Sequence, residues 1–255
     1  MLLTIDVGNT NIVLGGFCGD KLIFVARLST DTRSTDSEYA IKIREILALN
    51  SASETVDGCI ISSVVPPLTK KLKNAVKTIY GIDSLVVGPG IKTGVNLLVD
   101  NPAQVGADII SACVAAYNLY KPPVLVIDMG TATKMIVIDE KAAFRGVSII
   151  PGLETSLKAL AGSAALLPEI SLEAPEKVIA KNTVECMKSG AIFGNASLID
   201  GMIDRIFDEL GAPCTLVATG GLSEIPIPHC KHKINIDENL LLKGLYIMYN
   251  KNILN

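Results

Sequence analysis

The sequence contains no tryptophan, and only 4% of its 255 residues are aromatic. Its core must therefore be aliphatic, which suits a sheet covered by helices better than a carbohydrate-binding sandwich lined with aromatic rings. Charged residues make up 19% of the chain and the net charge is −3, so we expect no general attraction to nucleic acid or to an anionic membrane. The hydrophobic fraction of 49% can fill a sizeable core, which excludes intrinsic disorder.

Targeting segments and metal-ligand pairs are missing too. No uncharged apolar run reaches the ~20 residues that span a bilayer, and no basic and apolar leader of a secretory signal opens the chain. None of the six cysteines pairs as Cys-x-x-Cys, and His229, Cys230 and His232 are too few ligands for a zinc site. We therefore expect a soluble cytoplasmic protein with reduced, mostly buried thiols and no membrane or nucleic-acid partner.

The chain has no P-loop, no Gly-x-Gly-x-x-Gly after a strand and no protein-kinase His-Arg-Asp set. It carries one strand-and-turn pattern twice instead. Leu2–Asp6 and Val124–Asp128 are apolar strands that lead into Asp-x-Gly-x-x-Asn/Thr before another apolar strand. The copies lie nearly half the chain apart, with no charged or low-complexity linker between them. We therefore expect two similar, packed lobes, residues 1–115 and residues 116–255, each opening with a β-hairpin.

Short β-branched runs alternate with amphipathic segments along the whole chain, which is typical of an α/β fold. Pro66-Pro67 is expected to stop a buried strand. Helices are expected after the capping box Thr35-x-x-Glu38, over Ala103–Tyr120, from Asn182 to about Glu209, and after Asp237 to about Asn250. The other expected strands are Ile12–Phe17, Leu22–Leu28, Cys59–Val65, Leu85–Val87, Lys134–Ile138, Gly146–Ile150 and Leu216–Ala218.

The first Asp-turn has the chemistry of a phosphate site. Gly8 lacks the Cβ that would keep a phosphate away from backbone N–H groups, and Asn9, Thr10 and Asn11 add donors. Asp6 can hold Mg²⁺ directly or through water, since Mg²⁺ prefers oxygen ligands and keeps several waters. An ordinary hairpin turn also favours Asp, Gly and Asn. Two matching copies make the phosphate interpretation the stronger one.

A third motif, Ala218-Thr219-Gly220-Gly221, follows a strand near the end of the chain. A double glycine lets the backbone pass close to a flat ligand such as adenine, or simply opens a turn. The order Asp-turn, Asp-turn, Thr-Gly-Gly resembles the phosphate-1, phosphate-2 and adenosine motifs of the actin, sugar-kinase and heat-shock ATPase superfamily. The resemblance implies an α/β fold of two duplicated actin-like (ribonuclease H-like) lobes with a nucleotide cleft between them.

Further motifs run in order along essentially the whole chain. They are Asp6-Val7-Gly8-Asn9-Thr10-Asn11, Ser62-Ser63-Val64-Val65-Pro66-Pro67, Gly88-Pro89-Gly90-Ile91-Lys92-Thr93-Gly94, Asp100-Asn101-Pro102, Val105-Gly106-Ala107-Asp108, Asp128-Met129-Gly130-Thr131-Ala132-Thr133, Pro151-Gly152 and Ala218-Thr219-Gly220-Gly221-Leu222. Each is weak alone, but together they closely resemble the type III pantothenate kinase family. That family phosphorylates pantothenate with ATP and Mg²⁺ in the first step towards coenzyme A.

The resemblance also implies roles for single residues. The Asp6 to Asn11 turn would hold the ATP phosphates and Mg²⁺, and Thr131 would contact a phosphate. Asp128 matches a ligand of a monovalent cation, K⁺ or NH₄⁺. Thr183 matches a substrate contact that reaches the site from the second subunit of a homodimer. Gly220 and Gly221 would lie against the adenosine.

Asp108 matches the family's general base, and its position has a physical interpretation of its own. It lies near the start of a helix, after Gly106 and Ala107, where a carboxylate can accept the proton of an attacking hydroxyl. The alternative is a carboxylate that only stabilises the helix start through the macrodipole.

Three positions depart from the family pattern. Ile109 stands where the family usually has Arg, and Val99 stands where it has Tyr, so two polar contacts of the acceptor pocket are lost. This leaves open a kinase for another small hydroxyl substrate, or a non-catalytic nucleotide-binding regulator. The third departure is Lys134, which follows the second phosphate turn. Its ammonium group can neutralise Asp128 or a phosphate, or it can face solvent.

Overall fold

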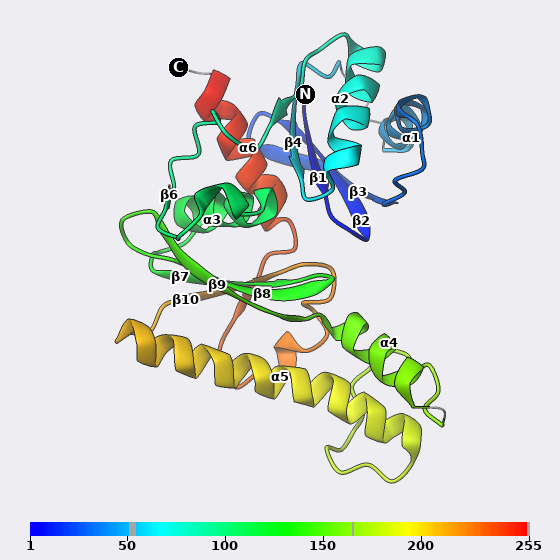
Figure 1. Ribbon diagram of the computed structural model, residues 1–255, viewed down its shortest axis with the longest axis vertical. Coiled ribbons are helices and arrows are strands. Elements are labelled where there is room, and N and C mark those ends of the chain that lie inside the picture. Colours follow the sequence, from blue (N-terminus) through cyan, green and yellow to red (C-terminus); the bar gives the residue numbers. More distant parts are fainter. Residues whose placement is uncertain (51–54, 165, 254–255) are drawn as a thin grey trace. The chain divides into compact units, whose positions relative to one another are not determined.

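The computed structural model describes residues 1–50, 55–164 and 166–253. The chain forms two compact units (Figure 1). Unit 1 contains the residues up to Asn118 together with the last helix, and unit 2 runs from Leu119 to Asn239. Each unit is an α/β body built on its own sheet, as the alternation of strands and helices predicts. None of the helices in the described ranges combines the length and apolar character needed to cross a membrane.

The sheet of unit 1 has the strand order β3-β2-β1-β4-β5. The first three strands are antiparallel, whereas β4 runs parallel to β1 and β5 parallel to β4. The strands of this unit are β1 (Leu2–Val7), β2 (Asn11–Cys18), β3 (Lys21–Ser29), β4 (Gly58–Ser63), β5 (Leu85–Val86) and β6 (Asn96–Leu97). Its helices are α1 (Asp36–Leu49), α2 (Pro66–Tyr80), α3 (Ala107–Leu119), α6 (Leu240–Ile253) and a 3₁₀ turn, η1 (Pro102–Gln104).

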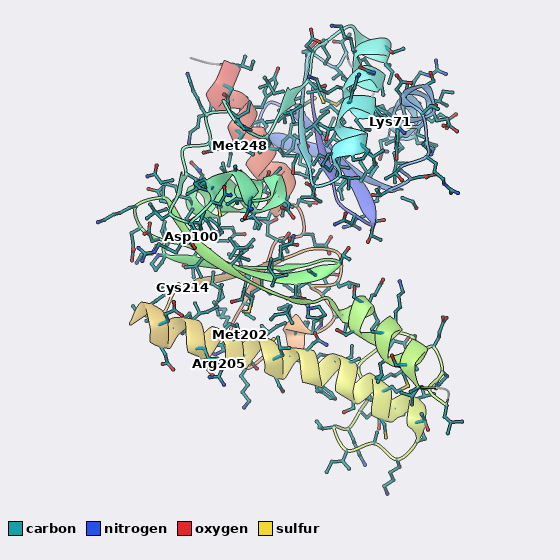
Figure 2. The ribbon with its side chains drawn as sticks, in the orientation of Figure 1. Lys71, Asp100, Met202, Arg205, Cys214 and Met248 are labelled. Carbon is teal, nitrogen blue, oxygen red and sulfur yellow. The ribbon has the colours of Figure 1, made fainter. Side chains whose placement is uncertain are left out.

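Strand alternation divides the core of unit 1 into two layers. Leu3 and Ile5 point to one face, where they pack with α1 and α2, and Leu2 points to the other face, where α3 and α6 pack. Figure 2 labels Met248 on α6, which is buried in this second layer. Asp6 shares the strand parity of Leu2, so it lies on the α3 face of the sheet.

Unit 2 repeats this topology with the strand order β9-β8-β7-β10-β11. Its strands are β7 (Val124–Met129), β8 (Ala132–Ile138), β9 (Ala143–Pro151), β10 (Thr215–Thr219) and β11 (Asn235–Ile236), and its helices are α4 (Leu153–Ser163), α5 (Thr183–Leu210) and the 3₁₀ turn η2 (Ile227–His229). The hairpin β7–β8 takes the place of β1–β2, and β10 pairs in parallel with β7 as β4 does with β1. The predicted duplication is confirmed.

One face of the unit 2 sheet packs against α5, which runs along it as a single long helix (Figure 1). Ile127 and Met129 of β7 are buried with Ile199 and Ile203 of α5. Met202, labelled in Figure 2, packs against the same cluster. Asp128 lies between Ile127 and Met129 in β7, so its side chain points to the other face of the sheet.

The structure differs from the sequence-based expectations at several helices. Pro66 and Pro67 were expected only to end a strand, but they also form the first two positions of α2. Proline is tolerated there because the first N–H groups of a helix have no partner within the helix. Helix α4 was also not expected. The helix expected from Ala103 starts at Ala107, after the η1 turn. The last helix starts at Leu240, and it packs in unit 1 although the expected division places it in the second lobe.

Two helix starts follow the expected capping. The Thr35 hydroxyl accepts the backbone N–H of Glu38, whose carboxylate accepts the N–H of Thr35, so the capping box is complete. Asn182 caps α5 through the N–H of Glu185. The Asp237 carboxylate accepts the N–H of Asn239 and the hydroxyl of Tyr120, and α6 starts at Leu240, two residues after the predicted start at Glu238.

Candidate functional site: two braced turns and a helix-start carboxylate

The first turn, between β1 and β2, is held rigid by backbone hydrogen bonds. The N–H of Gly8 donates to the carbonyl of Asn11 at 2.9 Å. Thr30, which follows β3, donates its hydroxyl to the carbonyl of Gly8 at 2.7 Å and its N–H to the carbonyl of Thr10 at 3.0 Å. The side chains of Asn9, Thr10 and Asn11 are exposed on this fixed frame. The turn is therefore organised before any ligand arrives.

Asp6 lies at the carboxyl ends of two parallel strands. It pairs in register with Ser62 of β4, so the two side chains are neighbours on one sheet face. The Ser62 hydroxyl is fully buried and has no hydrogen-bond partner among the described residues. A buried hydroxyl in this state calls for a ligand or water, since unmade hydrogen bonds are costly. One carboxylate and one hydroxyl suit Mg²⁺, which takes few protein ligands and keeps waters and phosphate oxygens.

Asp108 lies at the same edge of unit 1. Val64 donates its N–H to the carbonyl of Val7, so the chain leaving β4 stays against the end of β1. A Cβ on Gly106 would overlap the Asp108 carboxylate and would also contact Val64. Gly106 is thus the residue that allows this carboxylate to lie beside the β4 exit. Asp108 itself accepts the N–H of Ile109 at 2.8 Å and is half-buried.

Three of the predicted acceptor residues, Gly106, Ala107 and Ile109, adjoin Asp108 in the chain. Ala107 is buried in the layer between the sheet and α3. Ile109 is 8% exposed, as is usual for a packing residue, and Val99 is half-buried in the loop before η1. The structure therefore brings Asp6, Gly106 and Asp108 to one edge.

Two glycines pack closely against the backbone of the second turn, between β7 and β8. A Cβ on Gly152 would overlap the carbonyl oxygens of Gly130 and Thr131, and a Cβ on Gly220 would overlap that of Met129. Gly220 also has a φ of +94°, which L side chains rarely adopt. The Thr131 carbonyl accepts the N–H of Gly152 at 3.1 Å and the hydroxyl of Thr155 at 2.8 Å. Gly220, Gly221 and Thr131 therefore occupy one corner of unit 2.

Asp128 in this turn already has a cationic partner. Lys134 of β8 lies opposite Asp128 in the strand register, and its Nζ is 2.6 Å from Asp128 Oδ2. The side chains are 19% and 10% exposed respectively, so the pair is largely removed from water. On the other side, Thr219 of β10 is also in register with Asp128, and its buried hydroxyl has no hydrogen-bond partner within the described ranges.

The two turns are not the same length. In unit 1, Val7 pairs with Ile12, which leaves four residues between the paired positions. In unit 2, Met129 pairs with Thr133, which leaves three. The residue opposite Asp6 is consequently Val13, seven positions later, whereas the residue opposite Asp128 is Lys134, six positions later.

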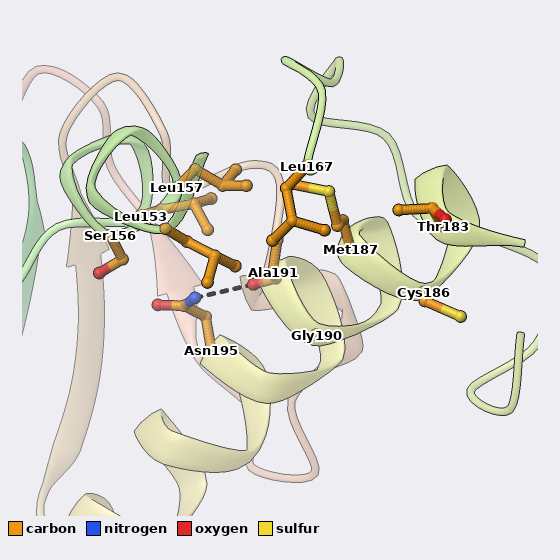
Figure 3. Close-up of a pocket in the computed structure, with 11 residues that line it drawn as sticks. Leu153, Ser156, Leu157, Leu167, Thr183, Cys186, Met187, Gly190, Ala191 and Asn195 are labelled. Atoms are coloured by element: carbon orange, nitrogen blue, oxygen red, sulfur yellow. Dashed lines mark hydrogen bonds between the residues drawn. The ribbon is translucent and has the colours of Figure 1, made fainter. Parts of the chain in front are cut away.

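Thr183 belongs to neither turn. It opens α5 and lines a groove between α4 and α5, together with Leu157, Leu167 and Met187 (Figure 3). The groove is mostly apolar; Asn195, on its wall, donates to the carbonyl of Ala191 at 2.7 Å. The role predicted for Thr183 concerns a second subunit and stays a prediction.

Sequence reasoning missed Ser62 and Thr219 as polar neighbours of the two aspartates. Ser62 belongs to a motif that was noted, but only the parallel register shows that it lies beside Asp6. Thr219 was assigned to the glycine motif rather than to Asp128. The signal was available in principle, since both are hydroxyl residues at the ends of otherwise apolar strands.

The chain is similar in sequence to known proteins along nearly its whole length. The family model described as type III pantothenate kinase matches residues 2–205. A type III pantothenate kinase of an Exiguobacterium species is 42% identical over 99% of both chains, and that of Brevibacillus brevis is 41% identical over 99% of both.

Solved structures share the fold at lower identity. A Baf family protein from Campylobacter jejuni has a TM-score of 0.62 at 20% identity, covering 99% of this chain and 100% of its own. Component A of the (R)-2-hydroxyglutaryl-CoA dehydratase from Acidaminococcus fermentans has a TM-score of 0.57 at 14% identity, covering 100% and 99%. The family-model match and the full-length similarity show that the chain belongs to the type III pantothenate kinase family.

Proposed function

We propose that this protein transfers the γ-phosphoryl group of ATP to the primary hydroxyl of pantothenate, giving 4'-phosphopantothenate. The observation that carries the proposal is the pair of rigid Asp-Gly turns, one per duplicated unit, with Asp108 at the edge of the first. Full-length similarity to type III pantothenate kinases supports the choice of acceptor.

In this mechanism each of the two units contributes its Asp-turn to the binding of the nucleotide. The turn from Gly8 to Asn11 and the Thr131 turn bind phosphate oxygens, and Gly220 and Gly221 lie against the adenosine. Asp6, with Ser62 beside it, would hold Mg²⁺, which would neutralise charge on the phosphates. The fixed backbone of both turns means that little reorganisation is needed when charge develops.

Asp108 acts as the general base. The acceptor oxygen forms its bond to the γ-phosphorus while the bond to the β-phosphate bridging oxygen breaks and ADP leaves. The hydroxyl proton passes to the Asp108 carboxylate. In a loose transition state the carboxylate contributes as much by positioning the hydroxyl as by its basicity.

We further propose a cytoplasmic homodimer. The apolar α4–α5 groove, with Leu160 48% exposed, is the surface that a second copy would cover. Thr183 at this groove would then reach the partner's acceptor site.

The test is ADP release measured with pantothenate and with a panel of related primary alcohols. Turnover with pantothenate, lost on Asp6→Asn, supports the proposal. Turnover with another alcohol alone would identify a kinase with a changed acceptor, as Ile109 and Val99 suggest. ATP binding without turnover on any acceptor would indicate a regulatory protein.

A further inference from the structure

The Asp128–Lys134 pair raises the question of which cation this corner of unit 2 uses. Resemblance to the family assigns a monovalent cation to Asp128. Here the Lys134 ammonium nitrogen is 2.6 Å from Asp128 Oδ2, so this carboxylate oxygen already has a positive charge within hydrogen-bond distance. Both side chains are largely buried, which weakens solvent screening. A second cation on Asp128 would meet repulsion from the ammonium, so the residues present do not fit a bound K⁺ or NH₄⁺.

The orientation of Lys134 follows from the backbone. Successive residues of a strand point to opposite faces, and directly paired residues share a face. Because the second turn has three residues between its paired positions, Lys134 shares the face of Asp128. With the four-residue spacing of the first turn, the position opposite Asp128 would be residue 135, and Lys134 would point towards the α5 core.

We propose that the Lys134 ammonium replaces the monovalent cation at Asp128, so that this protein works without added K⁺ or NH₄⁺. Lys134 is thereby a positioning residue, since it acts through Asp128 and the turn that carries Thr131. The kinetic part of this inference rests on the proposed function, whereas its cation-binding part does not.

The experiment compares native protein with Lys134→Thr, Lys134→Arg and the matched control Lys141→Thr. Lys141 is an exposed lysine of the same unit, in the β8–β9 turn. Two quantities are measured at constant ionic strength in Na⁺, K⁺ and NH₄⁺: kcat/KM for ATP, and the midpoint of thermal unfolding. The second needs no turnover and reports binding of the cation itself.

We expect kcat/KM of native protein, Lys134→Arg and Lys141→Thr to change less than about twofold between Na⁺ and K⁺. We expect kcat/KM of Lys134→Thr in Na⁺ to be at least about tenfold lower than that of native protein, and most of the lost kcat/KM to return in K⁺ or NH₄⁺. Its unfolding midpoint should rise with K⁺ concentration, while that of native protein stays constant.

Strong K⁺ activation of native protein, or a K⁺-dependent rise in its unfolding midpoint, would overturn the inference. So would a folded Lys134→Thr variant whose activity and midpoint both ignore K⁺. If Lys134→Thr does not fold, native protein and Lys134→Arg still test the inference, because K⁺ or NH₄⁺ dependence in either protein would contradict it. Absence of pantothenate turnover in native protein would count against the proposed function, while the unfolding midpoints would still test Lys134.

Discussion

Asp108 shows how a small backbone feature can position the carboxylate that we propose as the general base. Gly106 has no side chain in the volume that the Asp108 carboxylate occupies, and the N–H of Ile109 fixes one carboxylate oxygen. Gly106 therefore leaves room for the Asp108 carboxylate in this orientation. Sequence reasoning predicted a base at this residue, and that role stays a prediction; the contact between Gly106 and the carboxylate needed the structure.

Asp108→Asn should lower kcat by ~10²–10⁴-fold and leave the affinity for ATP within about twofold. The amide keeps the shape of the side chain but cannot accept the hydroxyl proton. Steady-state kinetics with pantothenate and calorimetric titration with ATP measure the two quantities. Unchanged kcat would show that Asp108 is not the base.

The six cysteines are all free, and their environments differ. Burial raises the pKa of the Cys59 and Cys113 thiols to about 12, and that of Cys214 to about 11. Burial also raises the pKa of Cys230 to about 12, with the Asp200 carboxylate adding to it. Cys186 is exposed on α5. The expectation of mostly buried thiols is thus right for Cys59 and Cys113 and wrong for Cys186.

Because the thiolate is the reactive form, the exposed Cys186 should react with a maleimide at pH 8 faster than the buried thiols. It should react faster still in Leu160→Lys than in native protein, since Cys186 lines the groove that a second copy would cover. The raised pKa values keep the other four named thiols protonated at this pH, and their reactivity should increase only as the pH rises towards 11–12. Mass spectrometry of peptides from native protein and Cys186→Ser measures this. Rapid labelling of Cys59 or Cys113 at pH 8 would contradict the described packing.

At the scale of elements, the second turn depends on close backbone approach. Gly152 and Gly220 come from two distant motifs, and both pack directly on the carbonyls of the turn. The sequence predicted that Gly220 and Gly221 allow close approach to a ligand. The structure adds that Gly152 and Gly220 allow close approach to the protein's own backbone.

Gly220→Ala should destabilise the protein by at least ~1–3 kcal/mol, because the new methyl meets backbone and the φ is positive. The matched control is Gly201→Ala in α5, where a Cβ meets nothing within 4 Å. That change should stabilise by ~0.5–1 kcal/mol, since alanine favours the helix. Thermal unfolding separates them, and equal effects would refute the packing argument.

The elements that sequence reasoning recovered are those with strong local signals. The capping box at Thr35 and the repeated Asp-turns are examples, because each rests on neighbouring residues. Helix α2 was missed because Pro66-Pro67 was interpreted only as a strand stop, although proline also suits a first helical turn. The orientation of Lys134 could not be predicted, since it depends on the hydrogen-bond register of a turn whose sequence resembles a longer one.

At the scale of the whole molecule, the clearest expectation is association. The α4–α5 groove exposes apolar side chains in unit 2, and Leu166 nearby is 92% exposed. We expect light scattering at micromolar concentration to give about twice the chain mass of 27.0 kDa. Leu160→Lys should produce monomers, whereas Leu49→Lys, at an 84% exposed leucine of α1, should not. A native monomer, or dimers in both variants, would contradict this assignment.

The return of α6 to unit 1 joins the beginning and the end of the described chain in one core. Leu242, Leu245 and Met248 are buried in the same layer as Leu2 and Ile60 of the sheet. Tyr246 stacks on Phe17 of β2, with ring centroids 4.7 Å apart. This contact could not be read from the order of the motifs, which place α6 after the second lobe.

The same connection has a consequence during synthesis on the ribosome. Strands β1 to β4 are made first, but part of one sheet face stays uncovered until residues 240–253 emerge. At ~5–20 residues per second, the chain between β4 and α6 takes roughly 10–35 s to translate. For that interval the nascent protein exposes part of an apolar sheet face, and exposed apolar surface of this kind promotes aggregation with other chains. Unit 2 can fold as it emerges, so the unit that begins first is the one completed last.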